Sequence, residues 1–205
     1  MCNELAKNFI DSIEKFDDKT YLLSIIIYNI APVIAKYKPS YLIIFHDKGR
    51  RNLYEAWEKY KNFIKKELKM EFYQLKKANY NTAVLFYNED DLSSVLKQER
   101  HVEFLSTYGY QKNMSLEKSL ERLKERYEKE CPHEIGIFLG YPIDDVIDFI
   151  NSSGKDALTF GYWKVYNNKD EAISTFKKYD EVKEKVMKLI MHGVEPLNII
   201  NDMLI

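Results

Sequence analysis

The sequence predicts a mixed α/β (α+β) fold, in which a small mixed sheet of about five strands, including one antiparallel hairpin, is flanked by helices. Short apolar runs that are typical of strands alternate along the chain with longer segments of helical periodicity. Two of the short runs are joined by a brief polar link, which favours a hairpin. The length of 205 residues, with 45% hydrophobic and 31% charged residues, favours a single globular domain over residues 1–205.

The first quarter of the chain predicts helices followed by a strand. Apolar residues at helical spacing cover residues 4–16, and a second helix, capped by Thr20, runs to about residue 30. Because proline disfavours helical geometry at the preceding residue, Pro32 predicts a break at Ala31 and a short helix after it. The continuous apolar run 41–45 predicts a strand that is covered on both faces.

The middle of the chain predicts a hairpin between helices. Residues 71–76 and 82–87 have the composition of strands, and Asn79-Tyr80-Asn81 links them. Residues that can cap a helix N-terminus precede the apolar spacing of each neighbouring helix. The caps are Asn52, Asn88 and Ser115, and the predicted helices cover residues 52–69, 89–108 with a break, and 115–130.

The last third predicts two more strands, over residues 135–139 and 158–166. Gly154 and Gly193 follow helical segments at the position where a left-handed residue often ends a helix. Asn168 is the expected cap of the longest helix. The predicted helices here cover residues 142–153, 168–192 and 195–205.

Charge and composition exclude several classes of protein. Lys and Arg number 31 against 32 Asp and Glu, and this balance argues against attraction of the whole protein to nucleic acid or to an anionic membrane. Two cysteines, Cys2 and Cys131, make no disulfide framework and indicate a reducing compartment. The most apolar stretch, residues 21–35, is shorter than the roughly 20 residues that span a bilayer. We therefore expect a cytoplasmic protein without a targeting segment.

The loop from His46 to Arg51 is the first candidate site. It follows a predicted strand, precedes a helix, and contains Arg50 and Arg51 in a chain with few arginines. Gly49 permits an unusual backbone angle, and the arrangement suits a phosphate or carboxylate. The loop lacks the Gly-Lys-Ser/Thr sequence of a P-loop. The alternative interpretation is a basic surface loop.

The glycine-rich segment around residues 131–166 is the second candidate site. Gly140-Tyr141-Pro142 is expected to turn at the C-terminal end of a predicted strand, where open α/β sheets bind ligands. The predicted ligand-binding residues here are His133, Glu134, Gly136, Gly140, Tyr141, Trp163 and Lys164. The alternatives are a tight turn with Tyr141 packed on a neighbour and core packing of Trp163. Asp144 and Asp145 would repel an anion from the first turn of the following helix.

Catalytic and metal-binding residues are not assigned. His133 and Glu134 could exchange a proton, but neighbours on a strand point to opposite faces. Cys131, His133 and Glu134 do not have the spacing of a zinc site, and no base is fixed beside Cys131. The sequence therefore predicts no metal site and leaves catalysis and any cofactor unassigned.

Three groups of residues carry a resemblance to a known family. They are Ala31-Pro32-Val33-Ile34-Ala35 with Lys38-Pro39-Ser40, PHEIGIFLGYP over residues 132–142 with Asp145-Val146, and GYWKVY over residues 161–166. In order and spacing they resemble an uncharacterised bacterial family of about this length, a domain of unknown function found mostly in anaerobes. The resemblance implies a bacterial cytosolic protein and a loose association with flavodoxin-type and iron-related genes. Relatives often have cysteine where this chain has Phe160, so no thiol mechanism is expected there.

The leading hypothesis is a cytosolic protein that binds a small anionic ligand or cofactor at the C-terminal ends of its strands. Arg50 and Arg51 would pair with the anion, and the turn at residues 140–142 would shape the pocket. This requires the two segments to lie at the same end of the sheet. The alternative is a protein–protein interaction module, an accessory in redox or iron metabolism with a flavodoxin-like partner.

Overall fold

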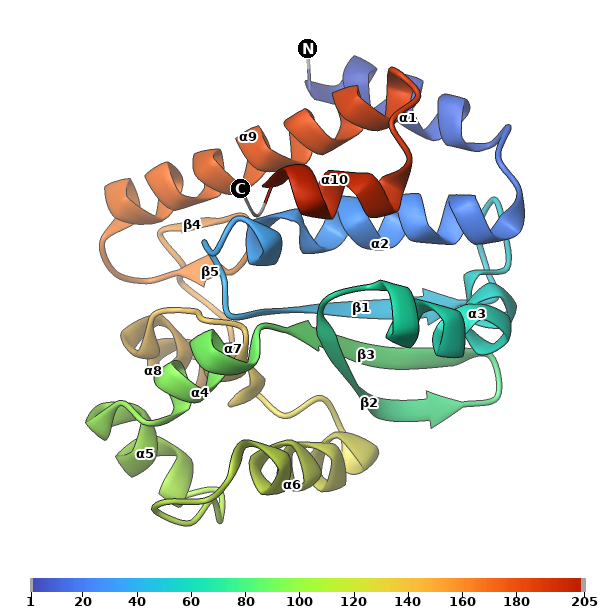
Figure 1. Cartoon of the computed structure of the whole chain (residues 1–205). Coiled ribbons are helices and arrows are strands. Elements are labelled where there is room, and N and C mark those ends of the chain that lie inside the picture. The colour runs from blue at the N-terminus through green and yellow to red at the C-terminus, as the bar shows by residue number, and fades with distance from the viewer. Residues whose placement is uncertain (1, 204–205) are drawn as a thin grey trace.

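A three-stranded antiparallel sheet lies between two layers of helices in the computed structural model, which describes residues 2–203 and the side chains of residues 4–200 (Figure 1). The helices are α1 (Cys2–Ile13), α2 (Asp18–Ile34), α3 (Leu53–Glu67), α4 (Glu89–Leu96), α5 (Glu99–Ser106), α6 (Leu116–Lys129), α7 (Ile135–Phe138), α8 (Ile143–Asn151), α9 (Lys169–Met191) and α10 (Pro196–Met203). The strands are β1 (Ser40–His46), β2 (Glu71–Ala78), β3 (Asn81–Tyr87), β4 (Thr159–Phe160) and β5 (Lys164–Val165).

The predicted mixed α/β class is confirmed, with its five strands divided between two antiparallel sheets instead of one mixed sheet. The larger sheet has the order β1-β3-β2, and β2 and β3 form the predicted hairpin. The smaller sheet is the pair β4-β5. The last two residues of the predicted terminal helix, 204 and 205, lie outside the described residues.

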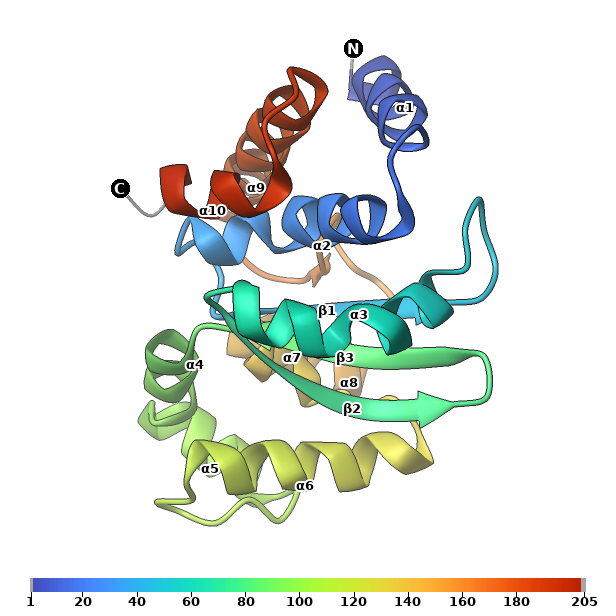
Figure 2. The ribbon, with the colours of Figure 1, turned by 45° about the vertical axis from the view of Figure 1, so that its right-hand side comes forward.

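Two hydrophobic cores cover the two faces of the larger sheet. Helices α1, α2, α3, α9 and α10 pack on one face, and α4 to α8 pack on the other (Figures 1 and 2). The central strand β3 supplies both cores, because Val84 and Phe86 point into the first and Ala83 and Leu85 into the second. Each fully buried Leu, Ile or Phe contributes roughly 1.5–3 kcal/mol, so these cores dominate the stability of the fold.

Strand β1 forms at the predicted place, but its expected burial on both faces is wrong. It is an edge strand of the sheet, and Ile44 within it is 43% exposed. An uninterrupted apolar run is explained better by the central position that β3 occupies, where six of seven residues are buried.

The predicted strand 135–139 is wrong, because these residues form the short helix α7. Its residues are buried on all sides, so the apolar run has no periodicity that separates a strand from a buried helical turn. The backbone of Gly136 lies so close to α8 that a Cβ there would be 2.7 Å from a methyl carbon of Val146. The turn at residues 140–142 therefore follows a helix and does not end a strand.

Helix α2 continues through Pro32, so the predicted break at Ala31 is also wrong. Pro32 lies in the last turn of the helix, where its missing N–H removes only one hydrogen bond. Its carbonyl accepts hydrogen bonds from the backbone N–H groups of Tyr37 (2.8 Å) and Lys38 (3.1 Å), and Lys36 adopts a left-handed φ of 57°. This turn ends the helix and sets the direction in which the chain enters β1.

The residues that begin the helices follow the prediction in three cases. Those three caps accept hydrogen bonds from N–H groups of the first turn, and they are Asn52, Asn88 and Ser115. For α2 the cap is Asp17 instead of Thr20, whose own N–H and hydroxyl donate to the Asp17 carboxylate. Asn168 precedes α9 as expected but has a φ of 46° and no capping hydrogen bond.

The predicted strand 158–166 is instead a short hairpin, in which residues 161–163 turn the chain between β4 and β5. The Trp163 indole N–H donates to the buried carboxylate of Asp145 in α8 (2.7 Å). The same carboxylate accepts backbone N–H groups of Tyr166 (2.9 Å) and Asn167 (2.8 Å). Asp145 therefore fixes the hairpin against α8, and its carboxylate oxygens are engaged within the protein.

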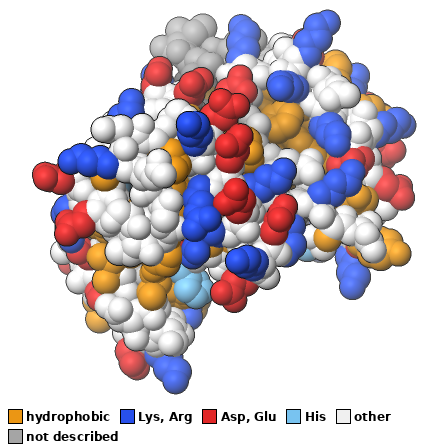
Figure 3. All heavy atoms as spheres, turned by 90° about the horizontal axis from the view of Figure 1, so that it is seen from below, with side chains coloured by type: hydrophobic (Ala, Val, Ile, Leu, Met, Phe, Trp, Pro, Cys, Tyr) orange, Lys and Arg blue, Asp and Glu red, His pale blue; other side chains and the backbone are white. Residues whose placement is uncertain are grey.

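Within the described residues, no helix combines the length and the apolar character that crossing a bilayer requires. Acidic and basic side chains are interspersed on the face that carries α5 and α6, which is seen from below in Figure 3. That face shows no broad field of one sign.

Candidate functional site

Arg50 and Arg51 are engaged within the protein. The Arg50 guanidinium pairs with Asp11 (2.9 Å) and Glu14 (3.0 Å) on and just after α1. Arg51 pairs with Asp18 (3.1 Å) and donates to the backbone carbonyls of Glu14 (2.5 Å) and Phe16 (2.8 Å). These contacts join the loop after β1 to the link between α1 and α2, so the two arginines have a clear structural role.

The two predicted site segments lie at opposite ends of β1, so the predicted shared pocket is wrong. Ser40, at the start of β1, donates its hydroxyl to the carbonyl of Phe138 (2.7 Å). Gly140 lies against Pro39, where a Cβ would be 2.5 Å from the proline ring. The arginines follow His46 at the other end, and a strand of seven residues separates the segments by roughly 20 Å.

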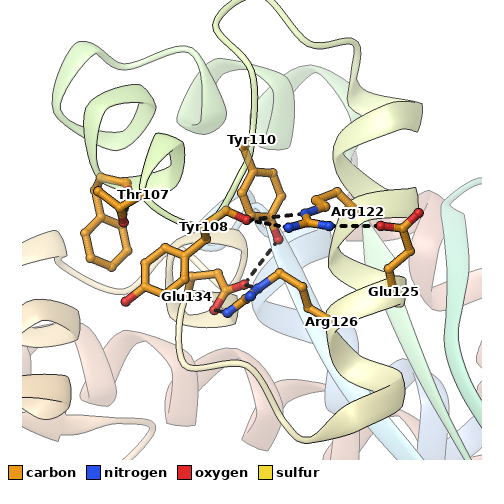
Figure 4. Close-up of polar contacts among 8 residues, drawn as sticks. Thr107, Tyr108, Tyr110, Arg122, Glu125, Arg126 and Glu134 are labelled. Carbon is orange, nitrogen blue, oxygen red and sulfur yellow. Dashed lines mark hydrogen bonds and ion pairs between the residues drawn. The ribbon is translucent and has the colours of Figure 1, made fainter.

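Glu134 lies in a buried ion pair (Figure 4). Its carboxylate accepts hydrogen bonds from Nε and Nη2 of Arg126 on α6, and the Tyr110 hydroxyl donates to it over 3.5 Å. Burial, followed by the charge of Glu134, raises the pKa of Tyr110, so this hydroxyl keeps its proton. The Arg126 guanidinium also lies over the ring of Tyr108, 4.9 Å from its centroid. Glu134 thus connects α6 to α7.

Five of the predicted residues do come together around one cavity of about 240 Å³, and they are His133, Gly136, Tyr141, Trp163 and Lys164. The rings of Tyr141 and Trp163 stack with centroids 5.2 Å apart. The Lys164 ammonium is occupied by the carbonyl of Gly154 (2.7 Å). Because the cavity wall is mostly apolar, it suits an apolar group better than an anion.

Tyr141 also borders a second, larger pocket of about 660 Å³, which we call the tyrosine-lined pocket. Its lining residues are Lys38, Tyr41, Leu42, Leu139, Tyr141, Phe160, Gly161, Tyr162, Phe176 and Asp180. They come from the start of β1, the end of α7, the β4-β5 hairpin and α9. The pocket therefore lies where the two helical layers and the hairpin meet.

Lys38 is the most unusual residue of this pocket. It is 4% exposed, and among the described residues its Nζ has neither a hydrogen-bond acceptor nor an ion pair. The ammonium instead faces three aromatic rings, at 5.0 Å from the centroids of Tyr41 and Tyr141 and 5.7 Å from that of Tyr179. Ring faces attract a cation, but this attraction is weaker than the hydration that the ammonium loses on burial.

A second buried lysine, Lys183 on α9, also lies against the ring of Tyr41. It is 7% exposed, and its Nζ is 4.9 Å from the ring centroids of Tyr41 and Tyr162. It donates a hydrogen bond to the Tyr41 hydroxyl (3.3 Å). Two ammonium groups thus share one tyrosine ring in a region shielded from water.

The environment shifts both lysines toward the neutral amine. Burial, and then the charge of Lys183, lower the pKa of Lys38 to about 7. Burial lowers the pKa of Lys183 to about 8, although Asp180 acts in the opposite direction. Burial also raises the pKa of Tyr41 and Tyr141, so the surrounding hydroxyls stay neutral. The pocket wall therefore presents one amine, that of Lys38, which changes charge near neutral pH.

Sequence reasoning missed both buried lysines and found only part of the wall of the tyrosine-lined pocket. Lys38 is noticed in the sequence only as a member of a motif, because nothing in a Lys-Pro pair signals burial. Lys183 had a usable signal, since it lies on the buried face of α9 with Tyr179, Val186 and Ile190. A lysine at an apolar position of a helical repeat is a candidate for a functional charge.

The sequence model of one protein family matches residues 26–200. The matched range contains all three motifs quoted above and both buried lysines. No curated protein and no solved structure matches the chain. The resemblance found in the motifs is confirmed at the level of the family: this chain belongs to the family described as "Protein of unknown function (DUF3793)".

Proposed function

We propose that the protein binds a small carboxylate in the tyrosine-lined pocket, with the Lys38 ammonium as its counter-ion. The observation that carries the proposal is a buried ammonium on a pocket wall that has no acceptor among the described residues. Leaving such a charge unpaired costs several kcal/mol, and a bound anion would recover much of that free energy. The proposed ligand is still a small anion, as predicted from the sequence, but the cation that pairs with it is Lys38 instead of Arg50 and Arg51.

The shape and charge of the pocket favour a carboxylate with an aromatic or apolar body. Its volume of about 660 Å³ is in the range of small-molecule sites, and five of its lining residues have aromatic rings that can contact such a body. A doubly charged phosphate would need more than one free cation, and Asp180 on the same wall would repel it. Trp163 stacks behind Tyr141 and keeps that wall in place.

The proposal is tested by thermal unfolding with benzoate, 4-hydroxybenzoate, phenylpyruvate and inorganic phosphate. We expect at least one carboxylate to raise the Tm of the wild type by roughly 5–10 °C at a hundredfold excess over Kd. The shift should be lost in Lys38→Met. Lys178→Met is the matched control, since Lys178 is an exposed lysine of α9. A panel that leaves the wild type unchanged, or that shifts Lys38→Met equally, would contradict the proposal.

Binding of a folded partner is a second candidate function, and one observation favours it. Leu158, just before β4, and Phe160, within it, are 57% and 82% exposed, although large apolar side chains are usually covered. The resemblance suggests a flavodoxin-type protein as the partner to test by biolayer interferometry. If this function is correct, Phe160→Ser weakens binding at least tenfold. Tyr80→Ser, which changes an exposed aromatic residue at the β2-β3 turn, leaves binding unchanged.

A further inference from the structure

The tyrosine-lined pocket contains a feature that anion binding alone does not need. A permanent cation such as arginine would serve a carboxylate at any pH. The pocket instead has a primary amine, buried among neutral rings and close enough to a second ammonium to feel its charge. Desolvation and a neighbouring cation are the two devices that make a lysine nucleophilic at neutral pH.

We propose that Lys38 is a nucleophile that forms an imine with the carbonyl group of a small keto acid bound in the tyrosine-lined pocket. This rests on the proposed function, because the carboxylate of the same ligand is what the pocket binds. It narrows the ligand to a carboxylate with a neighbouring ketone or aldehyde carbon.

The reaction balances without an oxidant or a cofactor. The lone pair of the neutral Nζ attacks the carbonyl carbon, a C–N bond forms, and the carbonyl π electrons move to oxygen. The resulting carbinolamine loses its oxygen as water, which takes both amine protons, and a C=N bond remains. One proton from solvent gives the protonated imine. Because this product again has a positive charge on nitrogen, it still pairs with the carboxylate of the ligand.

The titratable groups that face Lys38 or line its pocket come from several elements, and most of them are neutral. Tyr41 of β1, Tyr141 after α7 and Tyr179 of α9 present neutral rings, and Lys183 of α9 is the neighbouring cation. Asp180 is the one carboxylate among the described lining residues, and it accepts a hydrogen bond from the Tyr162 hydroxyl (2.8 Å). Lys183 is therefore the neighbouring charge that acts most strongly on the Lys38 amine.

The test is reductive trapping of the full chain with phenylpyruvate or pyruvate and sodium cyanoborohydride. Trapping adds the mass of one probe less one water plus two hydrogens, and peptide mass spectrometry locates the adduct. We expect one adduct per chain, at Lys38, while the exposed Lys178 stays unlabelled. At pH 7 the buried amine is neutral about a thousandfold more often than an exposed lysine, which supports this selectivity.

Two variants separate imine formation from binding and from a purely structural role of Lys183. Lys38→Arg retains the positive charge but is unable to form an imine, so it should bind the keto acid and give no adduct. Lys183→Met removes the neighbouring cation, so the pH at which trapping is half maximal should rise. A structural role of Lys183 alone would not move that pH.

Three results would overturn the inference: adducts spread over exposed lysines, an adduct that persists in Lys38→Met, or a wild type that binds the keto acid without being trapped. The last of these leaves the proposed function intact. A wild type that neither binds nor reacts with any carboxylate overturns both.

Discussion

The Lys38 ammonium lies among three tyrosine ring faces and near a second cation. This environment determines how Lys38 contributes to the free energy of unfolding. Burial disfavours the charged amine, so the folded state binds a proton less tightly than the unfolded chain. A lysine whose pKa is lowered on folding destabilises the protein below the folded pKa. That cost declines as the pH rises from about 7 towards the ordinary value of 10.5. The residue is therefore retained at a cost in stability, as functional charges often are.

Replacing Lys38 should therefore stabilise the protein. We expect Lys38→Met to raise the free energy of unfolding by roughly 2–4 kcal/mol below pH 7, after the attraction of the ring faces is set against desolvation. The gain should shrink steadily between pH 7 and 10.5. Urea unfolding followed by circular dichroism at several pH values measures it, with Lys178→Met as the control. Equal or lower stability of Lys38→Met at pH 6 would show that the ammonium has a partner in the folded protein.

Glycine has a packing role at Gly161 that concerns the pocket directly. A Cβ at this position would be 2.5 Å from the ring of Phe176, which is itself part of the pocket lining. Gly161→Ala should therefore destabilise the fold by about 1–3 kcal/mol and weaken ligand binding, because the ring must move. Gly193→Ala is a useful comparison: its Cβ would meet nothing within 4 Å, so it adds only backbone strain. Binding that survives Gly161→Ala unchanged would place the ligand away from Phe176.

At the scale of elements, the apolar patterns located the helices and the hairpin but failed where local rules compete with packing. The run 135–139 has no polar residue to reveal its period, so only its contacts with α8 show that it is helical. Pro32 is tolerated because it lies in the last turn of the helix, which ends two residues later at Ile34, and the sequence around it does not indicate this end. Arg126 and Glu134, eight residues apart, meet only because α7 folds back on α6.

The contact between α6 and α7 depends on that buried pair. Arg126→Met should lower the free energy of unfolding by about 3–5 kcal/mol, because it leaves the Glu134 carboxylate buried without its partner. The double variant Arg126→Met/Glu134→Met removes both charges and should lose less than the single variant. Urea unfolding of the single and double variants measures this coupling. Additive losses would mean that the pair is screened by water in the folded protein.

At the scale of the whole molecule, the strand order could not be derived from the sequence, and that order decides which loops meet. Because β1 lies at the edge, beside β3 alone, its start faces the ends of α2 and α7, and its end faces the α1–α2 link. Trp163 and Tyr141 were identified from the glycine-rich motifs, whereas Lys38 and Lys183 are 145 positions apart and become neighbours only in the fold. Long-range proximity of this kind leaves no local pattern.

The separation of the two ends of β1 gives a test of which end binds the ligand. Arg51→Ala removes an ion pair and two hydrogen bonds to backbone carbonyls, so it should lower the free energy of unfolding by about 1–3 kcal/mol. Because the tyrosine-lined pocket lies roughly 20 Å away along the strand, the Kd for the carboxylate that shifts the wild-type Tm should stay within twofold. Calorimetric titration of Arg51→Ala beside Lys38→Met makes the comparison. A Kd that rises in Arg51→Ala and not in Lys38→Met would place the anion at the loop from His46 to Arg51.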